Sequence, residues 1–380
     1  MVAGLLRPRT LWFGLLAVVL VVFPFVHAWP FFGGFVGEYR TFNATMFAVW
    51  LLVVLSMNLL TGYSGQVSLG HAAVVLVGAY TTGVLFDQYG LPLALAIFLA
   101  AAFTAVVGGV MIGIPAVRLS GPYLAIATFA LVISLPQILK IEAFTRWTNG
   151  ALGIRISEVQ PPGFADGVLD QPQWLYYAAM STAVIMTVLF WNLTRSRFGR
   201  AFVALRDSEI GAEQMGVNVP LYKALAFGVS SLYAGIAGGL FFAVQAFVAP
   251  ESLGFLESIL FLVAIVIGGL GTILGSVVGA LFLTFQAELI SELSDVIPDA
   301  DKLRGAIYGG LLILTILLFP RGVAGFVHGL LGGSPAAAQP PVLSGLRTGM
   351  AQVLARIRRA GEPAGRDDQR SDQPKGNRDR

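Results

Sequence analysis

Long apolar runs separated by short polar stretches dominate the sequence. A helix needs roughly 20 apolar residues to cross a bilayer. The pattern therefore predicts an all-α, polytopic integral membrane helical bundle with about ten spans, in which the shorter runs form complete, broken or re-entrant helices. The runs lie near residues 11–27, 45–60, 67–86, 92–114, 121–139, 174–192, 224–247, 256–271, 274–290 and 306–319.

The first run has two interpretations. Arg7 and Arg9 precede it and it ends at Ala28, a pattern that also occurs in cleaved secretory signal peptides. At about 16 residues the run is long for the apolar core of such a peptide. We therefore expect it to be the first span, and its cleavage would leave the rest of the topology unchanged.

The distribution of Lys and Arg predicts the orientation. With the N-terminus in the cytoplasm, inside segments hold eighteen of these cations and outside segments hold six. Cytoplasmic segments of membrane proteins are enriched in Lys and Arg. We therefore expect both termini to lie inside.

Composition narrows the functional classes. Of 380 residues, 56% are hydrophobic and 12% are charged, and the mean hydropathy is +0.77, which excludes a water-soluble globular enzyme. The net charge of +3 comes from residues 321–380, with ten basic and five acidic side chains, so nothing indicates a nucleic-acid partner. The chain has no cysteine and its three histidines are scattered, so we expect no metal site.

Charged side chains are nearly absent from the apolar runs. Asp87, Glu142, Glu257 and Glu288 all lie near predicted ends. Proton-driven carriers use ionisable relays inside the membrane, so this pattern argues against proton coupling and leaves sodium bound by backbone carbonyls open. None of the four lysines belongs to a phosphate-binding loop G-x4-G-K-[ST]. We expect the energy source on another chain.

A polar, glycine-rich break at residues 58–71 separates two apolar runs. Non-helical backbone at membrane depth is tolerated where protein or a water-filled cavity surrounds it. A helix beginning near Val67 would direct free N–H groups at the break, which suits a carboxylate or another polar solute. A tight turn with Ser68 capping the next helix is the alternative, and His71 alone also fits a packed, hydrogen-bonded side chain. The candidate pathway residues here are Asn58, Gly62, Tyr63, Ser64, Gly65, Gln66, Ser68 and His71.

A similar break follows Ala249 and continues at residues 266–276, VIGGLGTILGS. It supplies Gly268 and Gly271 as further pathway candidates. Glycine pairs spaced four apart (Gly109/Gly113, Gly235/Gly239, Gly271/Gly275/Gly279 and Gly305/Gly309) predict close helix packing within the bundle, and they do not by themselves indicate dimerisation.

The stretch at residues 196–216 is amphipathic. Phe198, Phe202 and Leu205 recur at helical spacing among mixed charges, and Ile210 and Met215 follow. The pattern favours a short helix whose exposed apolar edge docks into a partner's groove. The alternative is a helix lying on the membrane surface or on its own bundle, and the acidic content argues against the membrane surface.

Many short blocks occur in the order typical of one family. They resemble the permease subunits of the branched-chain amino-acid ABC transporter family, specifically its M-type subunit, over residues 40–326. The blocks are NLLTGYSGQVSLGHAA (58–73), PYLAIAT (122–128), TNG (148–150), SRFGR (196–200), RD (206–207), GVN (216–218), AF (226–227), AGIAG (234–238), IGGLG (267–271), Gly275, GA (279–280) and FPRGVA (319–324).

This resemblance implies a multi-pass subunit of the plasma (inner) membrane of a prokaryote. Its expected partners are two ATP-binding subunits, a second related permease or a second copy, and an external solute-binding protein. ATP and magnesium would bind the ATP-binding subunits, and this chain would carry no cofactor and would not itself be an enzyme. It assigns residues 40–326 to the transmembrane domain. Outside that range, the hydropathy pattern predicts the N-terminal span and an external loop in residues 1–39, and composition predicts a largely disordered cytoplasmic tail at residues 327–380.

The resemblance also implies roles for particular residues. Thr128 joins the pathway candidates, and residues 195–223 would form the loop that couples to the ATPase. The loop departs from the family pattern Glu-Ala-Ala-x3-Gly, because its residues 210–216 read Ile-Gly-Ala-x3-Gly with Glu209 one position early. The coupling candidates are Arg200, Arg206, Asp207, Glu209, Ala212 and Gly216.

Three functional hypotheses remain at this stage. The first is a permease subunit of an ATP-driven importer for branched-chain amino acids. The second is a permease of the same family for urea or short amides. The third, from a different class, is a stand-alone ion-coupled carrier or channel.

Overall fold

The computed structural model describes residues 38–119, 121–156, 159, 161, 169–296, 309–310 and 322–323. The predicted run at 11–27, most of the run at 306–319 and the tail at 327–380 lie outside this part of the chain. The eight predicted runs between residues 45 and 290 each coincide with helix.

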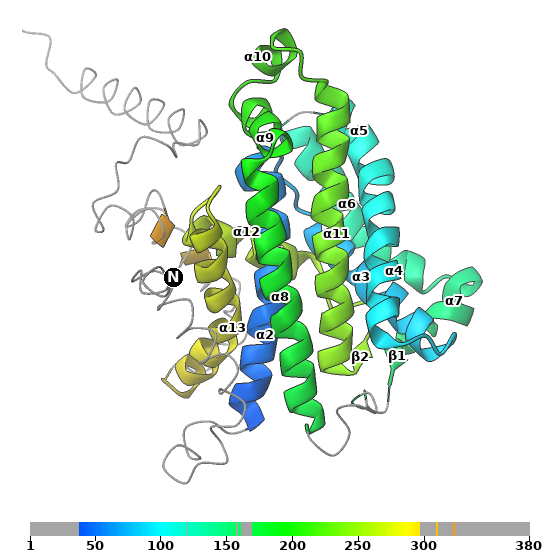
Figure 1. Ribbon diagram of the computed structural model, residues 1–380. Coiled ribbons are helices and arrows are strands. Elements are labelled where there is room, and N and C mark those ends of the chain that lie inside the picture. The colour runs from blue at the N-terminus through cyan, green and yellow to red at the C-terminus, as the bar shows by residue number, and fades with distance from the viewer. Residues whose placement is uncertain are drawn as a thin grey trace, which may run out of the picture. The chain divides into compact units, whose positions relative to one another are not determined.

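Helices account for nearly all the regular structure of the described residues (Figure 1). The all-α prediction is therefore correct apart from two short antiparallel strands, β1 (Ile154–Arg155) and β2 (Phe247–Val248). The helical elements in chain order are α2 (Glu38–Met57) continued by the π-helix η2 (Asn58–Tyr63), α3 (His71–Asp87), α4 (Leu93–Val107) continued by η3 (Gly108–Ile112) and α5 (Gly113–Arg118), α6 (Pro122–Leu139), α7 (Glu142–Thr148), η4 (Gly150–Leu152), α8 (Gln171–Arg195), α9 (Arg197–Asp207), α10 (Glu209–Gln214), α11 (Val219–Gln245), α12 (Phe255–Gly268) and α13 (Ile273–Val296).

Several of these helices are long and apolar enough to cross a membrane. Five stretches qualify, and three shorter apolar helices accompany them. The chain is thus a multi-pass membrane protein, while the count of ten spans and the inside location of both termini stay predictions. The five stretches are Thr41–Tyr63, Leu93–Arg118, Pro122–Leu139, Gln171–Arg195 and Val219–Gln245, and the shorter ones are His71–Asp87, Phe255–Gly268 and Ile273–Gln286.

Helix α11 packs against α2, α3 and α4. Its small residues allow backbones to touch: a Cβ atom on Gly238 would lie 2.1 Å from the Val75 carbonyl oxygen, and one on Gly78 would lie 2.6 Å from Gly235 Cα. In a lipid environment such close packing replaces the hydrophobic effect as the force between helices. The glycine spacings of α4–α5 and α11 therefore serve packing within the chain, as the sequence analysis expects.

The two ends of α8 and α11 carry different structures (Figure 1). Helices α9 and α10 lie between the end of α8 and the start of α11. At the opposite end, β2 directly follows α11 and pairs with β1. We refer to these as the α9–α10 end and the β end.

Candidate functional site

The first glycine-rich break is shorter than its sequence indicates. Helix α2 continues as a wide π-helix to Tyr63, and α3 begins at His71. The prediction of a helix beginning near Val67 is therefore wrong, and so is the alternative prediction that Ser68 caps the next helix: Gly70 is the N-cap residue and makes no side-chain cap. Only residues 64–70 lie outside helix.

Residues 64–70 form the connection through which the chain turns back from η2 to α3. The Ser56 hydroxyl and His71 Nε2 are hydrogen-bonded, so α3 begins beside the last turn of α2. Both side chains are buried, and His71 is a packed, hydrogen-bonded residue. Buried Ser64, Gln66 and Ser68 line the returning segment.

At the start of α3, backbone N–H groups donate hydrogen bonds to side chains of two other helices. The Leu69 N–H donates to Thr128 Oγ1 of α6 at 3.0 Å, and the Ala72 N–H donates to Ser258 Oγ of α12 at 3.0 Å. These donors therefore do not point freely at the break. Ser258 was not a candidate, although a serine inside an apolar run indicates that it could bond to the backbone of a neighbouring helix.

Asn58 joins the two glycine-rich breaks. Its Nδ2 donates to the Thr272 carbonyl oxygen at 2.8 Å and to Ser276 Oγ at 2.9 Å, and its Oδ1 accepts from the Gly271 N–H at 2.8 Å. The side chain is fully buried. One amide thus binds η2 to the turn between α12 and α13.

Arg206 of α9 reaches the same place. Its Nη1 donates to the Gly62 carbonyl oxygen at 3.0 Å. A Cβ atom on Gly65, whose φ is +72°, would lie 2.8 Å from Arg206 Cγ, and one on Gly271 would lie 3.4 Å from Arg206 Nη1. The candidate pathway and the candidate coupling loop are therefore in direct contact. We call Asn58, Gly62, Gly65, Arg206 and Gly271 the Arg206 junction.

The stretch at 196–216 forms two helices, so the prediction of one amphipathic helix is wrong. Ser208 interrupts it with φ −163° and caps α10, where its Oγ accepts from the Gly211 N–H at 3.0 Å. In α9, Phe202 and Leu205 are buried against the chain's own bundle. In and after α10, Ile210 and Met215 are 75% and 86% exposed, whereas Phe198 of α9 is 37% exposed, so most of the exposed apolar edge belongs to this second part.

The remaining coupling candidates have separate surroundings. Glu209 forms an ion pair of 2.7 Å with Lys223, whose side chain is 4% exposed. This ion pair connects α10 to α11. From the sequence alone, Lys223 is only one of the cations expected in the cytoplasmic segments. Asp207 accepts a hydrogen bond from Arg206, and Ala212 is buried. Arg200 is exposed and donates to the Arg195 carbonyl oxygen at 3.2 Å. Gly216 has a positive φ of +81°.

The other pathway candidates lie around the junction or beyond it. The ring of Tyr63 meets Phe190 edge-on with centroids 5.6 Å apart. A Cβ atom on Gly268 would lie 1.9 Å from the Gly275 carbonyl oxygen. Gln66 Nε2 donates to Ser64 Oγ at 2.9 Å, and its buried Oε1 has no partner within the described residues.

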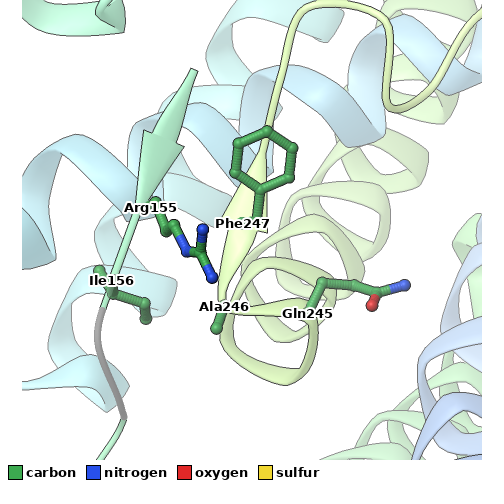
Figure 2. Close-up of a pocket in the computed structure, with 5 residues that line it drawn as sticks. All are labelled: Arg155, Ile156, Gln245, Ala246 and Phe247. Atoms are coloured by element: carbon green, nitrogen blue, oxygen red, sulfur yellow. The ribbon is translucent and has the colours of Figure 1, made fainter. Parts of the chain in front are cut away.

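Two adjoining cavities at the β end were not foreseen. One of about 430 Å³ is lined by Arg155, Ile156, Gln245, Ala246 and Phe247 (Figure 2). The second, of about 490 Å³, shares Arg155 and Phe247 and adds polar groups of the α3–α4 loop and of residues 146–149. Neither is lined by a predicted pathway residue. Among the described residues, no group of His, Asp and Glu could hold a metal ion.

Comparison with known proteins gives consistent results. A family described as "Branched-chain amino acid transport system / permease component" matches residues 40–316. The chain is 32% identical over 316 residues to the "High-affinity branched-chain amino acid transport system permease protein LivM" of Salmonella typhimurium, covering 78% of this chain and 72% of that protein. The Escherichia coli K12 protein of the same description is 31% identical over the same shares.

A more distant relative has a different description. The "Autoinducer 2 import system permease protein LsrC" of Photorhabdus laumondii is 33% identical over 159 residues, which is 40% of this chain and 46% of that protein. No solved structure matches the chain.

Proposed function

Because the chain belongs to the family of branched-chain amino acid transport permeases, we propose that it forms part of the membrane path of an ATP-driven importer. Branched-chain amino acids are its first expected solutes. The chain does no covalent chemistry in this role. Hydrolysis of ATP, with its magnesium, takes place on two separate ATP-binding subunits.

The observation that carries this proposal is the contact between α9 and the two breaks. Arg206 binds the Gly62 carbonyl, and Asn58 fastens Gly271 to the same turn. A loop that docks on an ATPase must transmit its movement to the solute path. Here the candidate loop and the candidate path share hydrogen bonds.

The mechanism follows from this contact. A docked external solute-binding protein delivers the solute at the β end, and the closing ATP-binding subunits displace α9 and α10. The displacement alters the Arg206 junction and exposes the path near residues 62–71 and 268–275 to the cytoplasm. A second related permease, or a second copy of this chain, completes the path.

The solute is the finer part of the proposal. The two relatives described as branched-chain amino acid permeases align over 72% of their length, which favours this solute class. The relative described as an autoinducer 2 permease aligns over 46% of its length and indicates that related permeases take other solutes. Urea and short amides therefore stay as alternatives within the family.

A stand-alone carrier or channel is the alternative from another class. The exposed Ile210 and Met215 favour the importer, because exposed apolar side chains on a polar loop fit a protein partner. A stand-alone carrier has no need of such a surface.

One purification followed by one flux assay tests the proposal. The tagged chain is solubilised from native membranes, co-purifying proteins are identified by mass, and the whole assembly is placed in liposomes. We expect an ATP-binding subunit, a second permease and a binding protein, and uptake of leucine, isoleucine or valine that needs ATP. Solute flux by the chain alone without ATP would establish the carrier instead.

A further inference from the structure

We propose that Arg206 is the positioning residue through which movement of α9 and α10 reaches the solute path. Its bond to the Gly62 carbonyl ties α9 to the first glycine-rich break, Asn58 bonds that break to the second, and movement of α9 therefore displaces both. This inference rests on the proposed function and adds a named residue to it.

The guanidinium of Arg206 is held on both sides. Its Nε and Nη2 lie 3.1 and 3.0 Å from Asp207 Oδ1, and its Nη1 lies 3.0 Å from the Gly62 carbonyl oxygen. The side chain is 16% exposed, whereas that of Asp207 is 57% exposed. Asp207 therefore orients the guanidinium from the solvent side, while Nη1 bonds to the Gly62 carbonyl. A lysine has no such planar fork and cannot make both contacts in one geometry.

The acceptor suits a cation. Gly62 lies at the end of η2, where carbonyl groups lack partners within the helix and the helix dipole is negative. Arg206 supplies the missing donor and the complementary charge. The guanidinium of Arg206, which belongs to α9, therefore caps the C-terminal end of the α2–η2 helix.

The glycines let the backbones meet there. A Cβ atom on Gly62 would lie 2.0 Å from Asn58 Oδ1 and 2.5 Å from the Gly271 nitrogen, and one on Gly65 would lie 3.1 Å from Arg206 Cα. The neighbours are the Asn58 amide and the Gly271 backbone at Gly62, and the side chain and Cα of Arg206 at Gly65. A displacement of the last turn of α9 therefore acts on the backbone of both breaks.

Asn58 carries the displacement further. Its three hydrogen bonds connect the Arg206 junction to the first turn of α13. The chain of contacts runs from Arg206 through Gly62 and Asn58 to Thr272. The α2–η2 helix and the α12–α13 pair, which are distant in sequence, would then move together.

The test measures coupling in the complete importer. Wild type, Arg206→Met, Arg206→Lys and Arg118→Met are purified as whole complexes and placed in liposomes. Arg118 is an exposed arginine at the end of α5, outside residues 195–223, so its variant makes the same change of charge away from the junction and the coupling loop. Leucine taken up and ATP hydrolysed are measured in the same vesicles.

We expect Arg206→Met to keep ATP hydrolysis within about twofold of wild type while leucine transported per ATP falls about tenfold, the factor expected for one charge-assisted hydrogen bond. Arg206→Lys should give a ratio between those of wild type and Arg206→Met, and Arg118→Met should match wild type. Should Arg206→Met fail to assemble, Arg206→Lys carries the test, and wild-type coupling in it would overturn the inference.

A second readout needs no transport. The chain contains no cysteine, so Leu270→Cys introduces a single thiol beside Gly271. Without ATP, a water-soluble maleimide should label this thiol several-fold faster in the Arg206→Met background than in the Arg118→Met background. Equal labelling rates would overturn the proposed role of Arg206.

The outcomes separate the two proposals. A wild-type complex with no ATP-dependent uptake would refute the proposed function and this inference with it. A working wild type whose Arg206→Met variant transports as much leucine per ATP would refute this inference alone.

Discussion

Single polar residues inside the apolar helices connect segments of this protein that are distant in sequence. Asn58, Thr128 and Ser258 each bond to the backbone of another helix or break. In a membrane these side chains have no water to turn to, so their bonds specify which segments lie together. The hydrophobic pattern alone cannot supply that choice, because every span is apolar.

The bonds of Asn58 can be tested by stability. Asn58→Leu removes its amide and leaves the Gly271 N–H and the Thr272 carbonyl without this partner, so we expect a loss of about 1–3 kcal/mol of unfolding free energy. The melting temperature in one detergent measures the change. Asn192→Leu, an exposed amide on α8, is the control and should melt like wild type. Equal melting of the two variants would contradict the role of Asn58.

The ion pair between Lys140 and Glu251 predicts a dependence on pH. Hydrogen bonding to the Lys140 ammonium lowers the pKa of the Glu251 carboxyl below its ordinary value of 4.5. A lowered carboxyl pKa stabilises the fold above the ordinary value, and this contribution is lost as the pH falls through the folded-state pKa. The effect is small, because exposed pairs contribute little.

The measurement compares wild type with Glu251→Gln. Wild type should melt slightly higher at about pH 7, and the difference should shrink as the pH falls below the ordinary carboxyl pKa of 4.5 and the carboxylate takes up its proton. A difference that grows on acidification would mean that the sign is wrong.

The sequence pattern indicates the separate residues of the Arg206 junction as functional candidates, but it does not indicate that they are in contact. Gly62, Gly271 and Arg206 were each singled out, the first two for a path and the third for coupling. Asn58 and Gly271 are 213 residues apart, and spacing along one sequence carries no information on contacts of that range. The bulk of the helices follows from the length of the apolar runs, which is a local property.

Helix boundaries show where local signals were present and missed. The stretch at 196–216 has apolar residues at helical spacing, which favours one helix, yet Ser208 followed by Glu209 is a helix-start signal. The π-helix at 58–63 and the strands at 154–155 and 247–248 had no comparable signal. Two-residue strands are too short to show alternation.

The packing of α11 gives a prediction for a whole element. Gly238→Ala places a Cβ atom 2.1 Å from the Val75 carbonyl oxygen, whereas the nearest contact for Gly228→Ala is an ordinary 3.4 Å. Both changes lie on α11 and add one methyl group. We expect Gly238→Ala to lose about 1–3 kcal/mol of unfolding free energy through overpacking.

Thermal unfolding of the two variants in the same detergent tests this difference. Gly228→Ala should remain near wild type. Should the two variants melt together, the close approach of α3 and α11 would not limit stability.

For the whole assembly, the exposed edge of α10 predicts where a partner binds. Ile210→Glu and Met215→Glu place a charge where an apolar contact is expected, and interfaces exclude such charges from their centre. We expect these variants to recover about tenfold less ATP-binding subunit in a pull-down, the effect of losing a central contact. Leu152→Glu is the control, since Leu152 is 77% exposed at the β end. Equal recovery in all three would place the ATP-binding subunit elsewhere.

The length of α11 has a mechanical consequence. At its C-terminal end it runs into β2, which is paired to β1, and at its N-terminal end Lys223 is bound to Glu209. With 27 residues the helix is about 40 Å long, so a rotation of about 5° around the β end moves the far end by about 3.5 Å. A shift of that size, passed through the Lys223–Glu209 pair to α10 and α9, is enough to break a hydrogen bond such as the one of 3.0 Å from Arg206 Nη1 to the Gly62 carbonyl oxygen. Helix α11 can thus act as a lever with its fulcrum at the strand pair, and a change in the stiffness of that fulcrum would alter how far each ATP cycle moves the path.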